Sequence, residues 1–382
     1  MDFTLTVEQR GLVDSTRSLL TRRASVEHAR RLIDSTEGFD ADLWKDGTDL
    51  GWPALGIPER DGGLGQQVVD LALVCAELGH GLAATPFIPV SVAADALATS
   101  TAENKSKLLQ LISEGSLIVG WAFTEFGRPW GTLGISTAAV PQGGGYRLSG
   151  TKVNVQDADA AQFLVVDALL DGAPARFLVP TDARGVEVVR QQTLDLTRSY
   201  CDVRLDDVLV DGSALCAAGA DAAAAITRSM HLHTVLVCAE LVGVGQRLLA
   251  MTVDYVKERV QFGRPVGSFQ AVKHKCADMR IWLQGSTAAT YHAAMVLDAA
   301  PENAGPESAA DVERAVSVAK AYTSDAAGRI AGEALQLHGG IGFTWEHNLH
   351  LYLRRARCGA LLSGDARFHR ETLCRLLESA SV

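Results

Sequence analysis

The sequence predicts an α+β chain of three parts: an N-terminal helical domain at 1–115, a central all-β domain at 116–216 and a C-terminal helical bundle at 217–382. The chain has 382 residues, more than one simple core usually holds. Apolar residues recur every three or four positions in the first and last parts, as in amphipathic helices. Between them the pattern changes to short segments rich in β-branched residues, which are typical of strands.

The N-terminal part begins with MDFTLTVEQRGLVDSTRSLLTRR, an amphipathic helical pattern with acidic residues at its front. This pattern differs from that of a signal peptide. The proline and glycines of GIPERDGGLGQ at 56–66 predict a break, and a helix is expected to start near Val68. GHGLAA at 79–84 matches G-x-G-x-x-A, but it follows a helical pattern instead of a strand. It therefore indicates a helix C-terminus and not a nucleotide-binding turn.

The central part contains six short segments of strand character. Most are bounded by glycine or aspartate, and several alternate between apolar and polar residues. They predict a compact all-β domain whose last strand ends near 212. The segments are SLIVGWAFTE, GYRLSGTKVNV, QFLVVDALL, ARFLVPTD, GVEVVRQQ and CDVRLDDVLV.

Alanine-rich helix is expected to resume at about 217. Residues 231–260 keep their apolar periodicity without a proline, which predicts a helix roughly 45 Å long. Further helical patterns follow, with the polar turn PENAGPES between two of them, and a terminal helix ends the chain. Long helices joined by short links predict an antiparallel four-helix bundle. The further patterns cover 269–298, 307–335 and 346–362.

Composition narrows the range of functions. Hydrophobic residues make up 47% and charged residues 21%, as in ordinary globular proteins. The net charge of −10 argues against nucleic acid as the main partner. None of the seven cysteines has CxxC spacing, which argues against a zinc site, and their spread suits a reducing compartment. We expect no metal, no membrane span and a cytoplasmic location.

The turn at 258–280 places several cations near a new helix. ERVQFGRPVGSFQAVKHKCADMR ends one helical pattern at Arg259 and starts another near Ser268, a plausible N-cap. A guanidinium beside a helix N-terminus favours a phosphate group. Solvated charges on a helix-to-helix link are the simpler explanation, and the residues of this turn alone favour it.

A second unusual turn lies at 336–343, where QLHGGIGF separates two helical patterns. Adjacent glycines reduce helix stability by about 1 kcal/mol each relative to alanine. They also remove side chains and allow another group to come close to the backbone. Both turns therefore combine reduced bulk with nearby polar groups at the ends of bundle helices.

At these two turns the chain resembles the FAD-dependent acyl-CoA dehydrogenase family. RVQFGRPVGSFQAVKHKCADM and QLHGGIGFTWEHNLHLYLRRAR resemble the two bundle signatures of that family. DLGWPALGIPERDGGLGQQVVDLALVCAELG resembles its N-terminal helical domain, so the resemblance covers nearly the whole chain. The family fold of helical domain, β-barrel and four-helix bundle agrees with the order predicted above.

The resemblance also assigns the two turns a role. In this family the matching residues contact the ADP half of an FAD that is held mainly by a neighbouring subunit. The glycines would let the dinucleotide lie against the backbone, and the arginine would counter the pyrophosphate charge. The matching positions here are Arg259, Gln261, Phe262, Gln270, Gln336, Gly339 and Gly340.

The catalytic base of the family is missing at its usual position. Most members carry a glutamate where LLSGDARFHR places Ser363, and a serine hydroxyl alone is not a competent base. Asp365 lies two residues later and is expected to face elsewhere on a helix. Other members carry the glutamate on the first bundle helix, at the position of His233. Histidine titrates near neutral pH, so His233 and Asp365 stay candidates for the base, while Glu240 is expected to have a structural or interface role.

Two segments that contact the flavin ring and substrate in the family also differ here. The loop that resembles T-E-P-G-A-G-S-D is TEFGRPWG at 124–131, in which Arg128 and Trp130 are expected to fill flavin or thioester space. The strand that resembles K-x-W-I-T-N is KVNVQD, with Asn154 and Gln156 replacing the Trp and Thr. The altered positions would serve the chain's own flavin, and the retained ones would serve a neighbour's.

The sequence therefore predicts the accessory subunit of a heteromeric acyl-CoA dehydrogenase, like those of the family's α2β2 members in steroid side-chain catabolism. A paralogous partner would carry the base, the substrate would be an acyl-CoA that is bulky or steroid-derived, and an electron-transfer flavoprotein would accept the electrons. Two alternatives stay open: a homo-oligomeric dehydrogenase with a relocated base, and a non-redox scaffold or binding protein with this fold.

Overall fold

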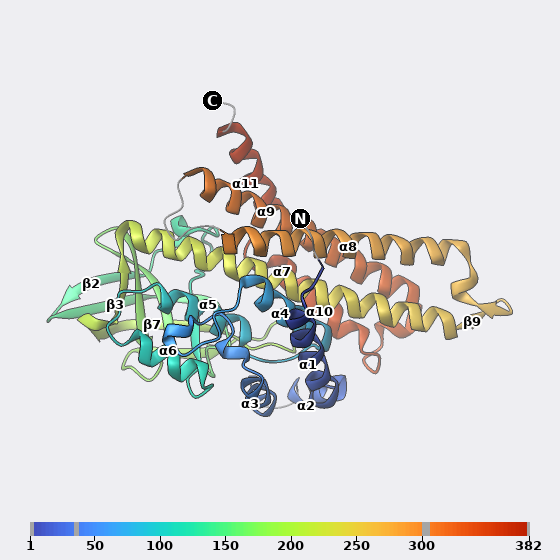
Figure 1. Ribbon diagram of the computed structural model, residues 1–382, viewed down its shortest axis with the longest axis horizontal. Coiled ribbons are helices and arrows are strands. Elements are labelled where there is room, and N and C mark those ends of the chain that lie inside the picture. Colours follow the sequence, from blue (N-terminus) through green and yellow to red (C-terminus); the bar gives the residue numbers. More distant parts are fainter. Residues whose placement is uncertain (1–3, 34–37, 300–305, 380–382) are drawn as a thin grey trace.

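The computed structural model describes residues 4–33, 38–299 and 306–379. Three regions follow one another along the chain, as Figure 1 shows: small helices, a sheet, and a bundle of long helices. The chain fold therefore has the predicted helical, β and helical order. The N-terminal helices are α1 (Val7–Arg23), α2 (Val26–Ile33), α3 (Ala41–Asp49), α4 (Val68–Gly81), α5 (Phe87–Ala98) and α6 (Lys105–Ser113).

Helix α4 confirms two expectations. It begins at Val68 and ends at Gly81, so GHGLAA lies at its C-terminus as predicted. Leu82 follows with a φ of 51°, a left-handed conformation that stops the helix. All residues from Val68 to Gly79 are buried, because α4 packs against the long bundle helix and the N-terminal helices.

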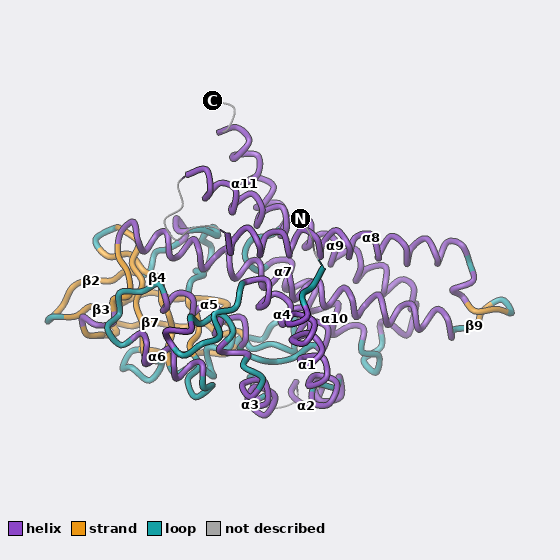
Figure 2. The backbone as a smooth tube through the Cα atoms, viewed as in Figure 1, coloured by secondary structure: helices purple, strands orange, loops and turns teal. Residues whose placement is uncertain are grey.

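The central region is a mixed sheet of eight strands, which gather at one end of the molecule in Figure 2. Its order is β6-β7-β3-β2-β4-β5-β8, and β1 pairs in parallel with β4. The strands are β1 (Val119–Ala122), β2 (Ala138–Gln142), β3 (Gly145–Gln156), β4 (Phe163–Leu170), β5 (Ala173–Pro180), β6 (Val186–Arg190), β7 (Tyr200–Asp211) and β8 (Leu215–Ala218).

The six predicted strand segments correspond to β1 and β3–β7, while β2 and β8 were missed. Strand β2 carries a proline, and its five residues are mostly exposed, so it lacks the apolar signal of a core strand. Strand β8 is a four-residue stretch that leads directly into helix at Gly219. It extends two residues past the predicted boundary at 216.

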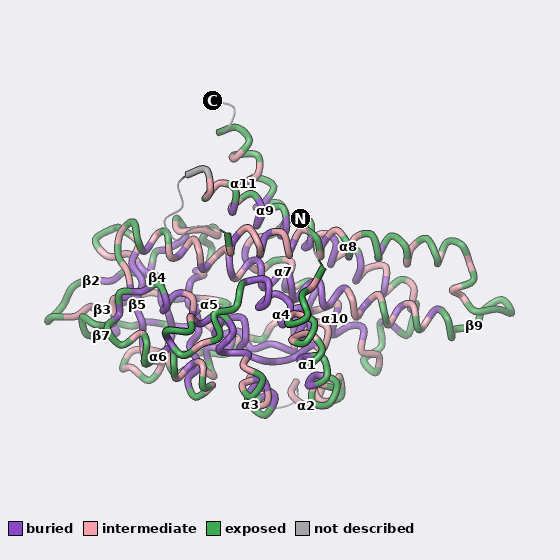
Figure 3. The backbone as a smooth tube through the Cα atoms, viewed as in Figure 1, coloured by how far each residue is buried: buried purple, intermediate pink, exposed green. Residues whose placement is uncertain are grey.

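The bundle contains three long helices and two shorter ones. Helix α7 is the longest, and at 1.5 Å per residue its 40 residues extend roughly 60 Å. In Figure 3 its middle is buried among the other helices. By length and composition α7 is apolar enough to cross a membrane, but 72% of its most apolar stretch is buried, as in a core helix. The bundle helices are α7 (Gly219–Glu258), α8 (Gln270–Ala299), α9 (Pro306–His338), α10 (Leu349–Leu361) and α11 (Ala366–Ser379).

A short hairpin projects from the end of the bundle that lies away from the sheet (Figure 1). Its strands β9 (Val260–Gln261) and β10 (Arg264–Pro265) join α7 to α8. The expectation that Ser268 caps α8 is wrong. Ser268 lies in a 3-10 turn, α8 begins at Gln270, and the carbonyl of Phe269 accepts the first helical amide hydrogen bonds.

Candidate functional site

A cavity of about 230 Å³ lies where α7 and the end of α10 meet the sheet. His233 enters it from α7, and Ser363 from the turn between α10 and α11. Asn154 of β3 and Trp121 of β1 contribute from the sheet. The cavity therefore brings together the two positions at which the resemblance expects alternative catalytic bases.

His233 and Ser363 are in direct contact. The Nδ1 atom of His233 lies 2.6 Å from the Oγ of Ser363. Burial lowers the pKa of His233 to about 4, with a smaller contribution from the ammonium of Lys320. His233 is therefore neutral near pH 7, and in the tautomer with its proton on Nε2 its Nδ1 accepts the hydrogen bond that the Ser363 hydroxyl donates.

The turn at Ser363 is held by its surroundings. Ser363 has a φ of 60° and Gly364 a φ of 84°, so the chain bends sharply there. His369 of α11 bonds the carbonyl oxygen of Ser363 through Nε2 at 2.8 Å, and its Nδ1 lies 3.1 Å from the hydroxyl of Ser317. The ammonium of Lys320 donates to the carbonyl oxygens of Gly359 and Ala360 in the last turn of α10. These contacts fix the backbone on both sides of Ser363.

Asp365 is placed differently. It is exposed, and its Oδ1 accepts a hydrogen bond of 2.8 Å from the backbone amide of Phe368. That contact is typical of an N-cap, which satisfies a free amide in the first turn of α11. Asp365 is not among the residues that line the cavity. Its geometry therefore favours a capping role over a catalytic one.

Aromatic side chains form one wall of the cavity. Trp121 stacks on Phe123 with 5.1 Å between ring centroids, and Trp130 packs edge-on against both. The ring of His233 lies 5.4 Å from that of Trp121 and 6.2 Å from that of Trp130. Trp130 comes from the altered TEFGRPWG loop, so this loop occupies space beside the candidate base. Arg128 lines the cavity too, whereas Phe126 of the same loop is 90% exposed.

Glu125 of that loop is structural. Its carboxylate pairs with the ammonium of Lys152 at 2.7 Å and accepts hydrogen bonds from the backbone amides of Ser136 and Thr137. Burial alone would raise the pKa of Glu125, but Lys152 and the hydrogen bonds hold it at about 2. Burial lowers the pKa of Lys152 more than Glu125 raises it, yet the close contact keeps the pair ionised near pH 7.

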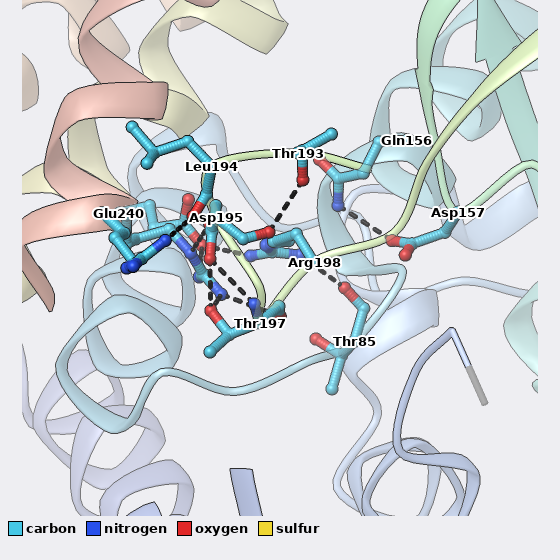
Figure 4. Close-up of polar contacts among 11 residues, drawn as sticks. Thr85, Gln156, Asp157, Thr193, Leu194, Asp195, Thr197, Arg198 and Glu240 are labelled. Atoms are coloured by element: carbon cyan, nitrogen blue, oxygen red, sulfur yellow. Dashed lines mark hydrogen bonds and ion pairs between the residues drawn. The ribbon is translucent and has the colours of Figure 1, made fainter. Parts of the chain in front are cut away.

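A buried ionic network lies two helical turns from His233 along α7. Glu240 accepts from Arg198 and from Arg355, the latter at 2.8 Å, and Arg355 also bonds Asp195 (Figure 4). All four side chains are at most 4% exposed. The network ties α7 and α10 to the loop between β6 and β7, so the expectation of a structural Glu240 is confirmed.

Asp157 lies at the sheet side of this network (Figure 4). Burial raises its pKa to about 7, although the guanidinium of Arg198 and the amide of Gln156 act in the opposite direction. Gln156 lines the cavity, whereas Asp157 does not. Asp157 is thus a buried acid behind the cavity wall, and no sequence motif marks it.

The residues expected at the ADP half of FAD lie at the opposite end of the bundle from the sheet. Arg259, Gln261, Gln270 and Gln336 are all exposed. Phe262 at the hairpin tip is 92% exposed and has a φ of 51°. A bulky side chain in that conformation is uncommon, and strain of order 1–3 kcal/mol is typical of binding sites. The hairpin therefore holds an exposed aromatic ring on a strained backbone position.

The two glycines of QLHGGIGF have different reasons for being glycine. Gly339 has a φ of 63°, a conformation that ends α9 and disfavours side chains. Gly340 has no such φ, and a Cβ added there would meet no atom within 4 Å. Packing within this chain therefore does not require glycine at 340. The ring of Tyr255 stacks on that of His338 at 4.5 Å, which connects this turn to the end of α7.

The buried histidines give a testable pH dependence. His369 is 3% exposed, and burial lowers its pKa to about 4, as for His233. Between pH 6.5 and 4 the unfolded chain binds more protons than the folded chain, so stability falls as pH drops. For His369 we expect a loss of about 2 kcal/mol between pH 7.5 and pH 5.

Urea unfolding of wild type and His369→Gln at the two pH values measures this loss. The variant should lose about 2 kcal/mol less than wild type over this interval. Asp157 contributes with the opposite sign in both proteins, so the difference between them isolates His369. Equal losses would contradict the assignment.

Family models match both helical parts of the chain. The acyl-CoA dehydrogenase C-terminal domain matches residues 222–377, and the acyl-CoA dehydrogenase N-terminal domain matches residues 6–116. Acyl-CoA dehydrogenase IpdE2 of Mycolicibacterium smegmatis is 31% identical over 94% of this chain and 96% of its own length. Acyl-CoA dehydrogenase FadE27 of Mycobacterium tuberculosis is 32% identical over 96% of each chain.

Solved structures are similar over almost the full length. A chain of the ChsE4–ChsE5 complex from Mycobacterium tuberculosis has a TM-score of 0.89 and 30% identity, covering 99% of both chains. A variant of the Tcur3481–Tcur3483 steroid ACAD has a TM-score of 0.86 and 28% identity, covering 98% of both chains. The fold and the order of elements are shared with these proteins.

Proposed function

Because the chain belongs to the acyl-CoA dehydrogenase family, we propose that it is the accessory subunit of a heteromeric, cytoplasmic FAD-dependent acyl-CoA dehydrogenase. A paralogous partner subunit carries the carboxylate base and the flavin-ring site. This chain completes the binding of the partner's FAD through the hairpin at 259–270 and the turn at 336–340. An electron-transfer flavoprotein accepts the electrons in this proposal.

The observation that carries this proposal is the contrast between the two candidate sites. The usual base position holds Ser363, whose hydroxyl bonds a neutral His233 in place of a carboxylate. The cavity there has about 230 Å³, below the 300–1,000 Å³ typical of sites for small ligands, and Trp130 forms part of its wall. This space is small for an isoalloxazine ring and a thioester together.

Exposed residues of the hairpin and the turn support their assignment to the ADP half of a neighbour's dinucleotide. Gly340 leaves open space next to the backbone, and Arg259 offers an exposed guanidinium for a pyrophosphate. The strained, exposed Phe262 offers an aromatic contact. When bound, FAD supplies the hydride acceptor for α,β-dehydrogenation of an acyl-CoA, and this chain's residues bind and position its ADP half.

The similar structures support the heteromeric part of the proposal. The ChsE4–ChsE5 complex and the Tcur3481–Tcur3483 steroid ACAD each pair two differently named chains. The second is described as a steroid enzyme, so we propose a bulky, steroid-derived acyl-CoA as the substrate class. Both points come from similarity to these proteins.

Flavin content tests the proposal. The chain purified alone should be colourless, and the chain co-purified with its paralogous partner should be yellow. In the complex we expect about 0.5 flavin per chain, since each complete site of an α2β2 assembly is shared by two chains. Absorbance at the flavin band, divided by protein concentration, gives this ratio.

A chain that is yellow by itself, with one flavin per subunit, would contradict the accessory role. It would favour the homo-oligomeric alternative, in which His233 takes the place of the base. A complex without flavin would favour the non-redox scaffold.

A further inference from the structure

Ser363 has the local geometry of an activated serine. It lies on a sharp bend between two helices, with positive φ values at Ser363 and Gly364. A serine on a strained turn, bonded to a histidine and facing a cavity, recurs among nucleophilic serines on unrelated folds. The 2.6 Å contact with His233 supplies the hydrogen bond that such a serine needs.

The protonation state of His233 suits a proton acceptor. In the tautomer that can serve as the base, Nδ1 accepts from Ser363 and the ring hydrogen is on Nε2. Nε2 has no hydrogen-bond partner among residues 4–33, 38–299 and 306–379. Its low pKa keeps the ring neutral down to about pH 5, although it also makes His233 a weak base.

The residue after the serine, Gly364, also lines the cavity. In acyl-transfer sites the amide that follows the nucleophile stabilises the negative charge on the carbonyl oxygen. The amide of Gly364 occupies that position in the chain. The turn therefore places a serine, a base and the following residue at one cavity.

We propose that Ser363 is a nucleophile, that His233 is its general base, and that the pair hydrolyses acyl thioesters. The choice of acyl-CoA as substrate rests on the proposed function. The acyl group would lie against the aromatic wall formed by Trp121 and Trp130. This is a hydrolytic activity that needs neither flavin nor partner.

The reaction balances with water as the only co-substrate. The Oγ of Ser363 attacks the thioester carbonyl carbon while its proton moves to Nδ1 of His233. The carbon–sulfur bond breaks, and the CoA sulfur takes that proton from His233. Water then attacks the acyl-serine ester, again giving a proton to Nδ1. The carboxylic acid leaves, and Ser363 regains its proton from His233. No atom changes its oxidation state.

The chain contains a control serine away from the cavity. Ser286 lies inside α8, is 2% exposed, and its hydroxyl donates to the carbonyl oxygen of Trp282 at 2.9 Å. It does not line the cavity. A substitution of Ser286 therefore removes a buried serine hydroxyl without touching the proposed nucleophile or the residues that hold its turn.

The first experiment labels the chain, purified alone, with a fluorophosphonate probe. Peptide mass spectrometry then locates the adduct. We expect the adduct on Ser363, no adduct there in Ser363→Ala, and labelling at least 100-fold slower in His233→Gln. Ser286→Ala should label within twofold of wild type. Absence of an adduct on Ser363 in the folded wild type, or equal labelling of His233→Gln, would overturn the proposal.

The second experiment follows release of CoA thiol from butyryl-CoA with a thiol-reactive chromogen. Wild type should exceed Ser363→Ala by at least 100-fold. Its rate should stay flat from pH 8 to about pH 5 and fall below that, following the pKa of His233 near 4. Equal release by wild type and Ser363→Ala would overturn the hydrolytic step.

These tests separate this inference from the accessory-subunit proposal. The fluorophosphonate arm involves no acyl-CoA, flavin or partner. If the chain forms the Ser363 adduct but also carries its own flavin, the accessory-subunit proposal is wrong and the proposal of a nucleophilic Ser363 stands. A chain that completes a partner's flavin site without forming the adduct would support the reverse conclusion.

Discussion

Replacing Glu240 with alanine is expected to destabilise the folded chain by about 3–5 kcal/mol. Its carboxylate accepts from both Arg198 and Arg355, and all three side chains are at most 4% exposed. Arg355 keeps Asp195, but Arg198 keeps only the carbonyl oxygen of Thr85 as a hydrogen-bond acceptor within the described chain. The buried guanidinium of Arg198 therefore loses the carboxylate that it is hydrogen-bonded to, and only the nearby carboxyl of Asp157 is left to offset its charge.

Urea unfolding followed by circular dichroism measures this loss. Glu333→Ala is the control, because Glu333 pairs with Lys275 in a partly exposed salt bridge that should contribute at most about 1 kcal/mol. Glu240→Gln keeps the shape of the side chain, so its loss in the free energy of unfolding should fall between those of Glu240→Ala and Glu333→Ala. If Glu240→Ala and Glu333→Ala unfold at the same urea concentration, the network does not stabilise the fold as we infer.

The second large effect is expected at Gly340. Apart from its chain neighbours, no described residue has an atom within 4 Å of a Cβ at this position, so a leucine there should change folding of the isolated chain by less than about 0.5 kcal/mol. The same leucine would occupy the space that we assign to the partner's ADP group. Gly340→Leu should therefore lower the flavin content of the co-purified complex at least tenfold.

Gly11→Leu is a suitable control, because a Cβ at Gly11 also meets no atom within 4 Å and the residue lies on α1, away from both turns. The complex containing this variant should retain its flavin. Arg259→Ala should also lose flavin, by removing the proposed counter-charge of the pyrophosphate. Full flavin content in the Gly340→Leu complex would contradict the assignment of this turn to the dinucleotide.

Elements with strong periodicity were predicted well from the sequence. Helix α4 and the long bundle helices have apolar faces that repeat over many residues, so their existence follows from local pattern. Strands β2 and β8 were missed because their pairing depends on neighbours in the sheet and not on apolar alternation. The first turn of α8 was placed early because Ser268 is a good N-cap residue that lies instead in a 3-10 turn.

The candidate site was predicted only in part. The resemblance to the family indicated Ser363 and His233 as separate positions for the base, 130 residues apart. Their direct hydrogen bond depends on how α7 packs against the end of α10, which no local pattern encodes. Lys320 and His369, which hold the turn at Ser363, carry no sequence motif, since both lie within ordinary helical patterns.

The long bundle also separates the two candidate sites within one molecule. The cavity lies beside the sheet, whereas the hairpin with Phe262 projects from the far end (Figure 1). The two sites share no residue, so substitutions in one are expected to have nearly additive, independent effects on the other. After a gene duplication, selection could therefore relax at one end of the molecule and persist at the other, and a duplicate could change its chemistry without losing its place in an assembly.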